Sequence, residues 1–243
     1  MCVIAYFPKN SKEPKKEDLK AMWDRNPDGG GMMWIEKDGV HYSKGYFDFN
    51  EFYKDFLIIK RDYDFECAVH FRIATSGGIN QEMCHPFPLT NEKSKLKALW
   101  GKTNCAVMHN GILPIDTPHK DLNDTCEFII NKMYPFYHKD HRFFLNLPKA
   151  KQNVFETTDL ANNKLLLFDK NGVKTFGHWQ KYKDYFVSNL YWSYYKPVRK
   201  SYSYNYNNYN NNNYNYDYDN TYYADNDNTY WDYLYRSAKD TEY

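Results

Sequence analysis

The sequence predicts an α+β fold in which antiparallel sheets are covered by helices. Two hairpins are the first indication, because Asp38-Gly39 and Asn171-Gly172 each separate two apolar segments, and such pairs are typical of tight hairpin turns. The second indication is the order of elements. Hairpins dominate and strand–helix–strand units are missing from the pattern, so the sheets are expected to be antiparallel with helices packed outside them.

The first half of the chain begins with an apolar segment, residues 2–7, which predicts a strand buried on both faces. Two apolar stripes with helical spacing follow: Leu19, Met22 and Trp23, and then Phe52, Phe56 and Ile59. Between them, residues 26–31 predict a glycine-rich loop, and residues 32–37 and 40–46 form the first hairpin.

The second half is predicted to consist mostly of paired strands. Residues 67–75 predict a strand whose alternation places His70 and Arg72 on one face. The remaining elements are paired strands at 96–100 and 105–108, a helix capped by Asn123 or Asp124 that continues through Tyr134, a short helix at 148–155, a hairpin of 164–168 with 173–176, and a strand at 185–187.

Composition excludes several classes of protein. The 243 residues carry a net charge of +1, which gives no electrostatic indication of nucleic acid or membrane binding. We expect no transmembrane helix, because no apolar run reaches about 18 residues. Five cysteines without a signal peptide favour a reducing, cytoplasmic location. Residues 1–198 are predicted to form one domain, and residues 199–243 a Tyr/Asn-rich tail that is disordered.

Cys2 combines two reactive groups if Met1 is removed. Its α-amine then titrates at roughly 7.7–8.0 and its thiol at about 8.5. A base near neutrality beside a nucleophile is sufficient for acyl transfer. The alternative is that Cys2 is a small buried strand residue without a chemical role.

Other polar residues fit the two ends of an amino-acid amide. Arg72 suits a carboxylate by two parallel hydrogen bonds, and Thr75 can bond the same substrate. Asn110 and Gly111 offer N–H donors to a developing oxyanion, and Asp124 offers acceptors to an ammonium group. Glutamine would use all of these groups at once. Each also has a structural alternative: a salt-bridged arginine, a strand-end threonine, an Asn-Gly turn and a helix cap.

These residues stand in ordered motifs that resemble class II glutamine amidotransferase domains of the N-terminal nucleophile (Ntn) hydrolase superfamily. The motifs are Cys2, Pro27-Asp28-Gly29, His70-Phe71-Arg72-Ile73-Ala74-Thr75-Ser76-Gly77, His85-Pro86-Phe87 and His109-Asn110-Gly111. The resemblance implies a four-layer αββα sandwich, no cofactor, and hydrolysis of the glutamine side-chain amide through a Cys2 thioester. It implies that Asn110 and Gly111 form the oxyanion hole, and that Arg72, Thr75 and Asp124 bind glutamine. Members of this family are often fused to a synthase domain, and no such domain fits into the predicted tail. Either the ammonia passes to a separate enzyme, or the protein is a glutaminase alone, or it acts on another amide.

Three alternatives remain open at the level of sequence. The first is a zinc site using the cysteines and histidines at positions 67, 70, 84, 85, 105 and 109, although their spacing lacks paired Cys-x-x-Cys knuckles. The second is a catalytically silent Ntn-fold binding protein. The third is an Ntn hydrolase that acts on another amide.

Overall fold

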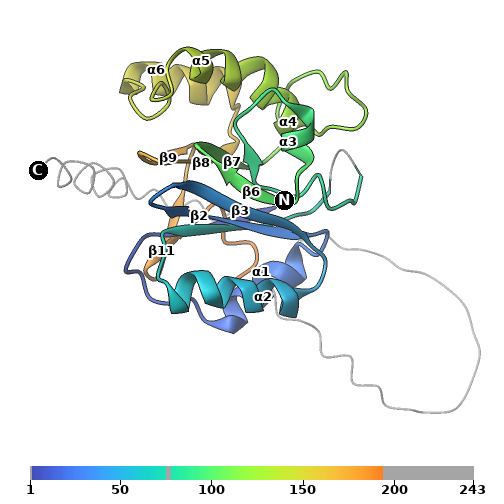
Figure 1. Ribbon diagram of the computed structural model, residues 1–243, viewed down its shortest axis with the longest axis vertical. Helices are drawn as coiled ribbons and strands as arrows, with labels where there is room; N and C mark the ends of the chain where they lie inside the picture. The colour runs from blue at the N-terminus through green and yellow to red at the C-terminus, as the bar shows by residue number, and fades with distance from the viewer. Residues whose placement is uncertain (1, 75–77, 194–243) are drawn as a thin grey trace, which may run out of the picture. The chain divides into compact units, whose positions relative to one another are not determined.

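The computed structural model describes residues 2–74 and 78–193. These residues lie in one compact unit, Met1–Tyr195. Thr75 and the predicted tail at 199–243 lie outside the described residues. The structure contains two antiparallel sheets and helices that pack on them (Figure 1), as the hairpin pattern predicts.

The larger sheet has seven strands and is built around the N-terminal strand β1. Every pairing in it is antiparallel. In spatial order the strands are β10 (Gln180–Tyr182), β11 (Tyr185–Val187), β1 (Val3–Phe7), β4 (Cys67–Phe71), β2 (Gly30–Glu36), β3 (Gly39–Tyr46) and β6 (Trp100–Thr103). All five residues of β1 are buried, which confirms the predicted strand covered on both faces.

The smaller sheet has four strands, all paired antiparallel. In spatial order they are β5 (Phe87–Pro88), β7 (Cys105–Asn110), β8 (Lys164–Asp169) and β9 (Gly172–Phe176). The chain continues from the end of β7 into the Asn110-Gly111 turn. This turn therefore lies at the C-terminal end of a fully buried strand.

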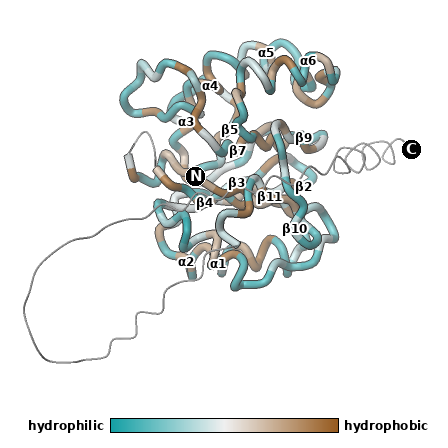
Figure 2. The backbone as a smooth tube through the Cα atoms, turned by 180° about the vertical axis from the view of Figure 1, so that it is seen from behind, coloured by the Kyte–Doolittle hydropathy of each residue, from teal (hydrophilic) through white to brown (hydrophobic). Residues whose placement is uncertain are grey.

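Helices cover the sides of the two sheets that face away from each other (Figure 1). The larger sheet packs on α1 (Lys16–Arg25) and α2 (Phe49–Leu57), and both predicted apolar stripes are buried there. Around the smaller sheet lie α3 (Lys93–Lys97), α4 (Asp124–Phe128), α5 (Tyr134–Lys139) and α6 (Lys149–Val154). Hydrophobic and hydrophilic stretches alternate along the helices (Figure 2), as expected for helices with one buried side.

The two sheets contact each other through the alternate residues of their strands. Val3, Ala5 and Phe7 of β1 point into the core with α1 and α2. The ring of Tyr6 on the opposite face of β1 packs edge-on against Phe168 of β8, with 5.7 Å between centroids. The face of β1 that carries the even-numbered residues, including Cys2, is therefore the face toward the smaller sheet.

Both predicted hairpins are present, but their turns lie one residue earlier than predicted. Glu36 pairs with Gly39, and Asp169 pairs with Gly172, so each glycine is the first residue of its second strand. Both glycines have positive φ, +145° and +151°, which explains why glycine is found there although it is not in the turn itself.

The predicted pairing of segments 96–100 and 105–108 is wrong. Leu96 is a buried residue of α3, β6 is the edge strand of the larger sheet, and β7 belongs to the smaller sheet. Burial explains the separation, because β7 is buried at every position whereas β6 is partly exposed throughout. A fully buried strand such as β7 must be covered on both of its faces. The exposed edge of the larger sheet, where β6 lies, does not offer such cover.

Residues 26–31 are not a simple loop, since β2 begins at Gly30. At Gly31 a Cβ atom would lie 2.0 Å from the carbonyl oxygen of His85. This close approach of two backbone segments therefore requires glycine at this position. It places the segment before β5 against the start of β2, beside the candidate site.

Candidate functional site

Four of the predicted site residues line one small cavity near the place where β1 begins and β4 and β7 end. They are Cys2, Arg72, Gly111 and Asp124, and the same cavity is lined by Ile73, His85, His109, Asn123 and Thr125. Asn110 is buried next to Gly111 without lining the cavity. Thr75 lies outside the described residues.

Cys2 is held by its backbone and its sulfur. Its carbonyl accepts a hydrogen bond from Asn189 Nδ2 at 2.8 Å. Its Sγ lies 3.4 Å from the N–H of Ile73, which donates to it, and 3.5 Å from the Ile73 carbonyl oxygen. Burial raises the pKa of the Cys2 thiol, against the lowering effect of the Ile73 hydrogen bond. The thiol therefore needs a base to become a nucleophile.

Arg72 follows β4 and is buried, with 3% of its surface exposed. Its Nη1 donates to the carbonyl of Gly78 at 2.7 Å. Its backbone pairs with the Pro27-Asp28-Gly29 segment, because Arg72 N–H donates to Gly29 and Asp28 N–H donates to Arg72. The Asp28 carboxylate also accepts from Ala74 N–H at 2.9 Å. The Pro-Asp-Gly segment thus fixes the backbone that carries the guanidinium.

Asn110 ends β7 and is anchored to β1 through one hydroxyl. Its Nδ2 donates to Ser188 Oγ at 2.8 Å, and the same oxygen accepts from the N–H of Ile4 at 2.9 Å. The Asn110 Oδ1 atom is buried without a hydrogen-bond partner. The side-chain amide is therefore linked through Ser188 to β1, and its Oδ1 atom is unsatisfied.

Gly111 has φ +142° and lies against Asn163. A Cβ atom on Gly111 would be 1.6 Å from Asn163 Oδ1, so both the conformation and the contact require glycine. The amide of Asn163 is oriented by its Nδ2, which donates to the carbonyls of Ile112 and Leu160.

Asp124 is the first residue of α4, but Asn123 is the cap. The Asn123 side chain accepts from Cys126 N–H at 2.9 Å, which decides between the two predicted caps. The Asp124 carboxylate accepts from the N–H groups of Leu113 and Thr125, at 2.9 and 2.8 Å. It is thus oriented by backbone donors where it lines the cavity.

A network of buried histidines, which the sequence analysis considered only as zinc ligands, lies at the same cavity, and two of its members, His85 and His109, line it. His109 Nε2 faces Asn163 Oδ1 at 3.0 Å and therefore donates to it. His109 Nδ1 then accepts from the hydroxyl of Thr125, at 2.9 Å. Because the Thr125 hydroxyl has one proton, its oxygen accepts from His85 Nε2 at 3.2 Å. His70 Nε2 faces the carbonyl of His109 at 3.1 Å and donates to it.

Burial keeps these imidazoles neutral. It lowers the pKa of His70 to about 3, and it lowers the pKa values of His85 and His109 as well. The motifs His-Pro-Phe and His-Asn-Gly indicated His85 and His109 in the sequence. Thr125 stands in the pattern Asp124-Thr125-Cys126-Glu127, whereas no local pattern indicated Asn163 or Ser188.

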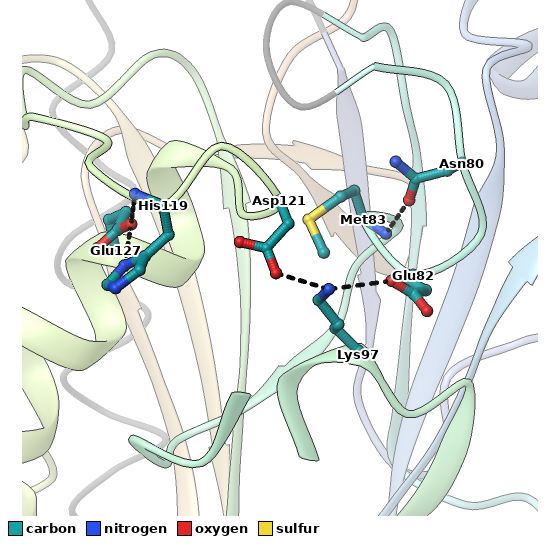
Figure 3. Close-up of polar contacts among 7 residues, drawn as sticks. All are labelled: Asn80, Glu82, Met83, Lys97, His119, Asp121 and Glu127. Carbon is teal, nitrogen blue, oxygen red and sulfur yellow. Dashed lines mark hydrogen bonds and ion pairs between the residues drawn. The ribbon is translucent and has the colours of Figure 1, made fainter. Parts of the chain in front are cut away.

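The loops beside the cavity are fastened by polar contacts (Figure 3). Lys97 of α3 lies between Asp121 and Glu82, with its Nζ at 2.8 and 3.6 Å from their carboxylates. The buried Glu127 of α4 accepts from both the N–H and the Nδ1 of His119. Residues 112–123, which lead to Asn123 and Asp124, are thereby attached to two helices.

The residues that the structure describes contain one group with metal-binding spacing, Glu36, Asp38 and His41 in the β2–β3 hairpin. The Asp38 carboxylate is already paired with His41 at 2.7 Å and with Lys102 at 2.9 Å. The six cysteines and histidines weighed as zinc ligands do not form such a group among the described residues. Cys67 and His70 are three positions apart on β4, so their side chains are expected on opposite faces of the strand. Cys67 indeed lies in the core with α1 and α2, whereas His70 contacts β7 of the smaller sheet.

The cavity itself has a volume of about 20 Å³, which is room for roughly one water molecule. A substrate as large as glutamine therefore enters only if groups around the cavity move.

In the part of the chain that the structure describes, none of the helices has the length and apolar character needed to span a membrane.

No family model and no curated protein matches this chain. Among solved structures, it is similar to glutamine phosphoribosylpyrophosphate amidotransferase from B. subtilis, complexed with ADP and GMP, with 12% identity and a TM-score of 0.45. The match covers 77% of this chain and 41% of that one, so the chain spans less than half the length of the matched protein. A likeness at this level is too weak to assign a fold or a family.

Proposed function

We propose that this protein hydrolyses the side-chain amide of glutamine as a class II, Ntn-type glutamine amidotransferase domain. The observation that supports this most is the shared cavity, because Cys2, Arg72, Gly111 and Asp124 reach it from four segments far apart in the sequence. A thiol, a guanidinium, a backbone N–H and a carboxylate are the groups that such a substrate needs.

In the proposed reaction, the α-amine of Cys2, freed by removal of Met1, takes the thiol proton. The thiolate attacks the amide carbon, forming the carbon–sulfur bond of a γ-glutamyl thioester. The carbon–nitrogen bond breaks as the protonated amine returns its proton to the leaving nitrogen, which departs as ammonia. Water then hydrolyses the thioester, giving glutamate and regenerating the thiol.

The other residues take the roles that the sequence predicts. Arg72 and Thr75 hold the substrate α-carboxylate, and Asp124 accepts from the α-ammonium group. Gly111 N–H and Asn110 Nδ2 donate to the oxyanion. Asn110 Nδ2 has two protons, so the bond to Ser188 leaves one for this purpose.

The arrangement of the elements is consistent with a four-layer αββα sandwich, since two sheets lie between two sets of helices (Figure 1). We place the domain at residues 1–198 and keep 199–243 as a disordered tail. The ammonia is proposed to serve a separate synthase, and the protein is proposed to be cytoplasmic.

The test measures glutamate and ammonia release from glutamine by the purified full chain. Intact-mass analysis first establishes that Met1 is absent. Cys2→Ala is expected to abolish release, while Cys67→Ala, which removes a thiol buried against α1 and α2, is expected to retain it. Release that survives in Cys2→Ala contradicts the proposal.

The small cavity favours a second candidate, a catalytically silent Ntn-fold binding protein. A retained Met1 together with no turnover of glutamine or of other amides would favour it, because a peptide bond then removes the base. Turnover of another amide but not glutamine would instead favour a related amide hydrolase.

A further inference from the structure

The side-chain amide of Asn163 contacts residues on both sides of Gly111, whose N–H we assign to the oxyanion. Asn163 directly precedes β8 and is 5% exposed. Its Oδ1 accepts from His109 Nε2 at 3.0 Å, and its Nδ2 donates to the carbonyl of Ile112 at 3.0 Å. One buried amide therefore joins a residue before Gly111 to a residue after it.

The orientation of this amide is fixed by its partners. The carbonyl oxygens of Ile112 and Leu160 only accept hydrogen bonds, so the Nδ2 of Asn163 must face both of them. Its Oδ1 is then directed to His109 and Gly111. Neither an apolar side chain nor a carboxylate satisfies all of these contacts, so they specify an amide.

The same amide restrains the Gly111 peptide. A Cβ atom on Gly111 would lie 1.6 Å from Asn163 Oδ1 and 2.6 Å from its Cγ, so the amide occupies the side of Gly111 where a side chain would stand. Before Gly111, the chain is held by the pairing of Asn110 with Lys164 at the end of the smaller sheet. After Gly111, it is held at the Ile112 carbonyl. The peptide groups around Gly111 therefore lie between two restraints, and Asn163 provides the second.

The Gly111 N–H is a donor at the wall of the cavity. Gly111 lines this cavity together with Cys2, and among the described residues no other group accepts from its N–H. A donor lowers the barrier of acyl transfer only if it is already aimed at the place where negative charge develops. A residue that holds the Gly111 peptide in one direction therefore affects the rate although it does not touch the substrate.

The backbone before Asn163 is held in a conformation that its residues rarely adopt. Ala161 and Asn162 both have positive φ, +45° and +70°, and alanine in particular is uncommon in this region. A Cβ atom on Gly177 would lie 2.3 Å from the Asn163 carbonyl oxygen, so the backbone of Asn163 is also enclosed from a second segment. Backbone strain of this kind collects at functional sites, where the surrounding structure holds a group in place. The group held here is the amide of Asn163.

We propose that Asn163 is a positioning residue of the oxyanion hole. Its amide holds the Gly111 peptide so that the N–H of Gly111 is aimed at the developing oxyanion. This role rests on the proposed function, because the oxyanion forms only if an amide is hydrolysed at Cys2. The restraint on Gly111 itself rests on the contacts of the fold.

Steady-state kinetics with glutamine test the role in the reaction. Asn163→Ala should lower kcat by roughly tenfold or more with little change in KM, because the oxyanion exists in the transition state and not in the bound substrate. The matched control is Asn162→Gly, which keeps the left-handed backbone and removes an exposed side chain of the same type, and it should retain kcat. An unchanged kcat in Asn163→Ala, or a loss confined to KM, overturns the role.

The restraint is measured separately, by ¹⁵N relaxation of the Gly111 N–H in the full chain. Labelling asparagine carbonyls with ¹³C and glycine with ¹⁵N selects the pairs Asn110-Gly111 and Asn171-Gly172, and Asn171→Ser identifies which signal is which. The order parameter of the Gly111 N–H should fall from about 0.85 toward 0.6 in Asn163→Ala, while that of Gly172 stays the same. An unchanged order parameter at Gly111 overturns the restraint.

Asn163→Asp is the second variant if Asn163→Ala does not fold. It keeps the acceptor toward His109 and loses the donor toward Ile112, so the same two measurements apply with the same expected results. If neither variant folds, Asn163 supports the whole fold and the proposal fails.

The two measurements separate this proposal from the proposed function. If the parent protein releases glutamate and Gly111 keeps its order in the variant, positioning fails and hydrolysis stands. If the parent releases no glutamate but Gly111 loses order in the variant, hydrolysis and the oxyanion role fail together, and Asn163 is left as the residue that orders this turn.

Discussion

At the scale of single residues, Arg72 is the buried charge that we propose as the partner of the substrate carboxylate. Its backbone is fixed by the Pro27-Asp28-Gly29 segment and its Nη1 by the Gly78 carbonyl. The planar guanidinium keeps further N–H groups in a fixed fork. A carboxylate bound there would receive two parallel hydrogen bonds from a group that is already oriented.

Arg72→Lys should therefore raise KM for glutamine by roughly tenfold or more, since a charged hydrogen bond is worth about 1.5–3 kcal/mol. A lysine retains the charge but not the fork. Steady-state kinetics measure the effect, with a thermal melt to show that the variant is folded. An unchanged KM in a folded variant would remove Arg72 from carboxylate binding.

Asn110 and Ser188 are expected to act as one unit. Asn110→Ala should lower kcat on the order of 10²–10³-fold, as for loss of an oxyanion donor. Ser188→Ala should lower kcat by a smaller factor without changing KM, because it frees the amide that Ser188 holds at 2.8 Å.

Kinetics of both single variants and the double variant measure this coupling. In the Asn110→Ala background, Ser188→Ala should add little, because the group that it orients is gone. Fully additive losses would show that Ser188 stabilises the fold and does not position the amide.

Residue types and motifs were sufficient to select four residues that the structure brings to one cavity, and the contacts that they did not indicate have a clear cause. Cys2, Arg72, Gly111 and Asp124 stand in local motifs, and the structure brings them to one cavity. Ser188 contacts Asn110 across 78 positions and Asn163 contacts His109 across 54. A single sequence gives no indication of such distant side-chain partners.

At the scale of elements, helix α4 connects the candidate site with the hydrophobic core between the smaller sheet and its helices. Its first turn carries Asp124 and Thr125 at the cavity, and Glu127 in the same turn is fully buried. The Glu127 carboxylate accepts a hydrogen bond from His119 Nδ1 and another from Asn131 Nδ2, the latter at 3.1 Å. The position of Asp124 thus depends on the contacts of Glu127 with His119 and Asn131, which the local sequence does not reveal.

Glu127→Ala should destabilise the protein by about 1–3 kcal/mol, because the hydrogen bonds that His119 and Asn131 donate to its buried carboxylate are lost. Asp121→Ala is the matched control, since it breaks the exposed ion pair with Lys97, and such pairs are worth about 0–1 kcal/mol. Urea unfolding of both variants measures the difference. Equal losses would show that the His119–Glu127 contact holds no more than a surface ion pair.

Element types were predicted well where periodicity was strong, as in α1, α2 and the two hairpins. The pairing of β6 and β7 was predicted wrongly, because adjacent short strands can belong to different sheets. Burial decides this, and the 79% exposure of Trp100 is a property of the assembled fold. The local sequence shows that residue Trp100 is apolar, but it does not show that this side chain is exposed in the fold.

At the scale of the whole molecule, the two sheets meet across a set of neutral histidines. His70 of β4 bonds to the backbone of β7, and His85 and His109 share the Thr125 hydroxyl. All three have pKa values lowered by burial. The contact between the sheets therefore requires imidazoles without charge.

The protein should lose stability as the pH falls below about 6.5. Unfolded histidines bind protons near that pH, whereas the folded pKa of His70 is about 3, so the unfolded state takes up more protons in this range. Each such histidine reduces the free energy of unfolding by about 1.4 kcal/mol per pH unit, from about pH 6.5 down to its folded pKa. Above pH 6.5 these histidines contribute no further change.

Urea unfolding at about pH 7 and pH 5 measures this loss while most carboxylates stay ionised. His70→Gln retains a donor toward the His109 carbonyl but cannot titrate. Its stability should therefore fall less between the two pH values, by roughly 2 kcal/mol, than that of the parent protein. An equal fall in both proteins would mean that His70 is not held neutral between the sheets.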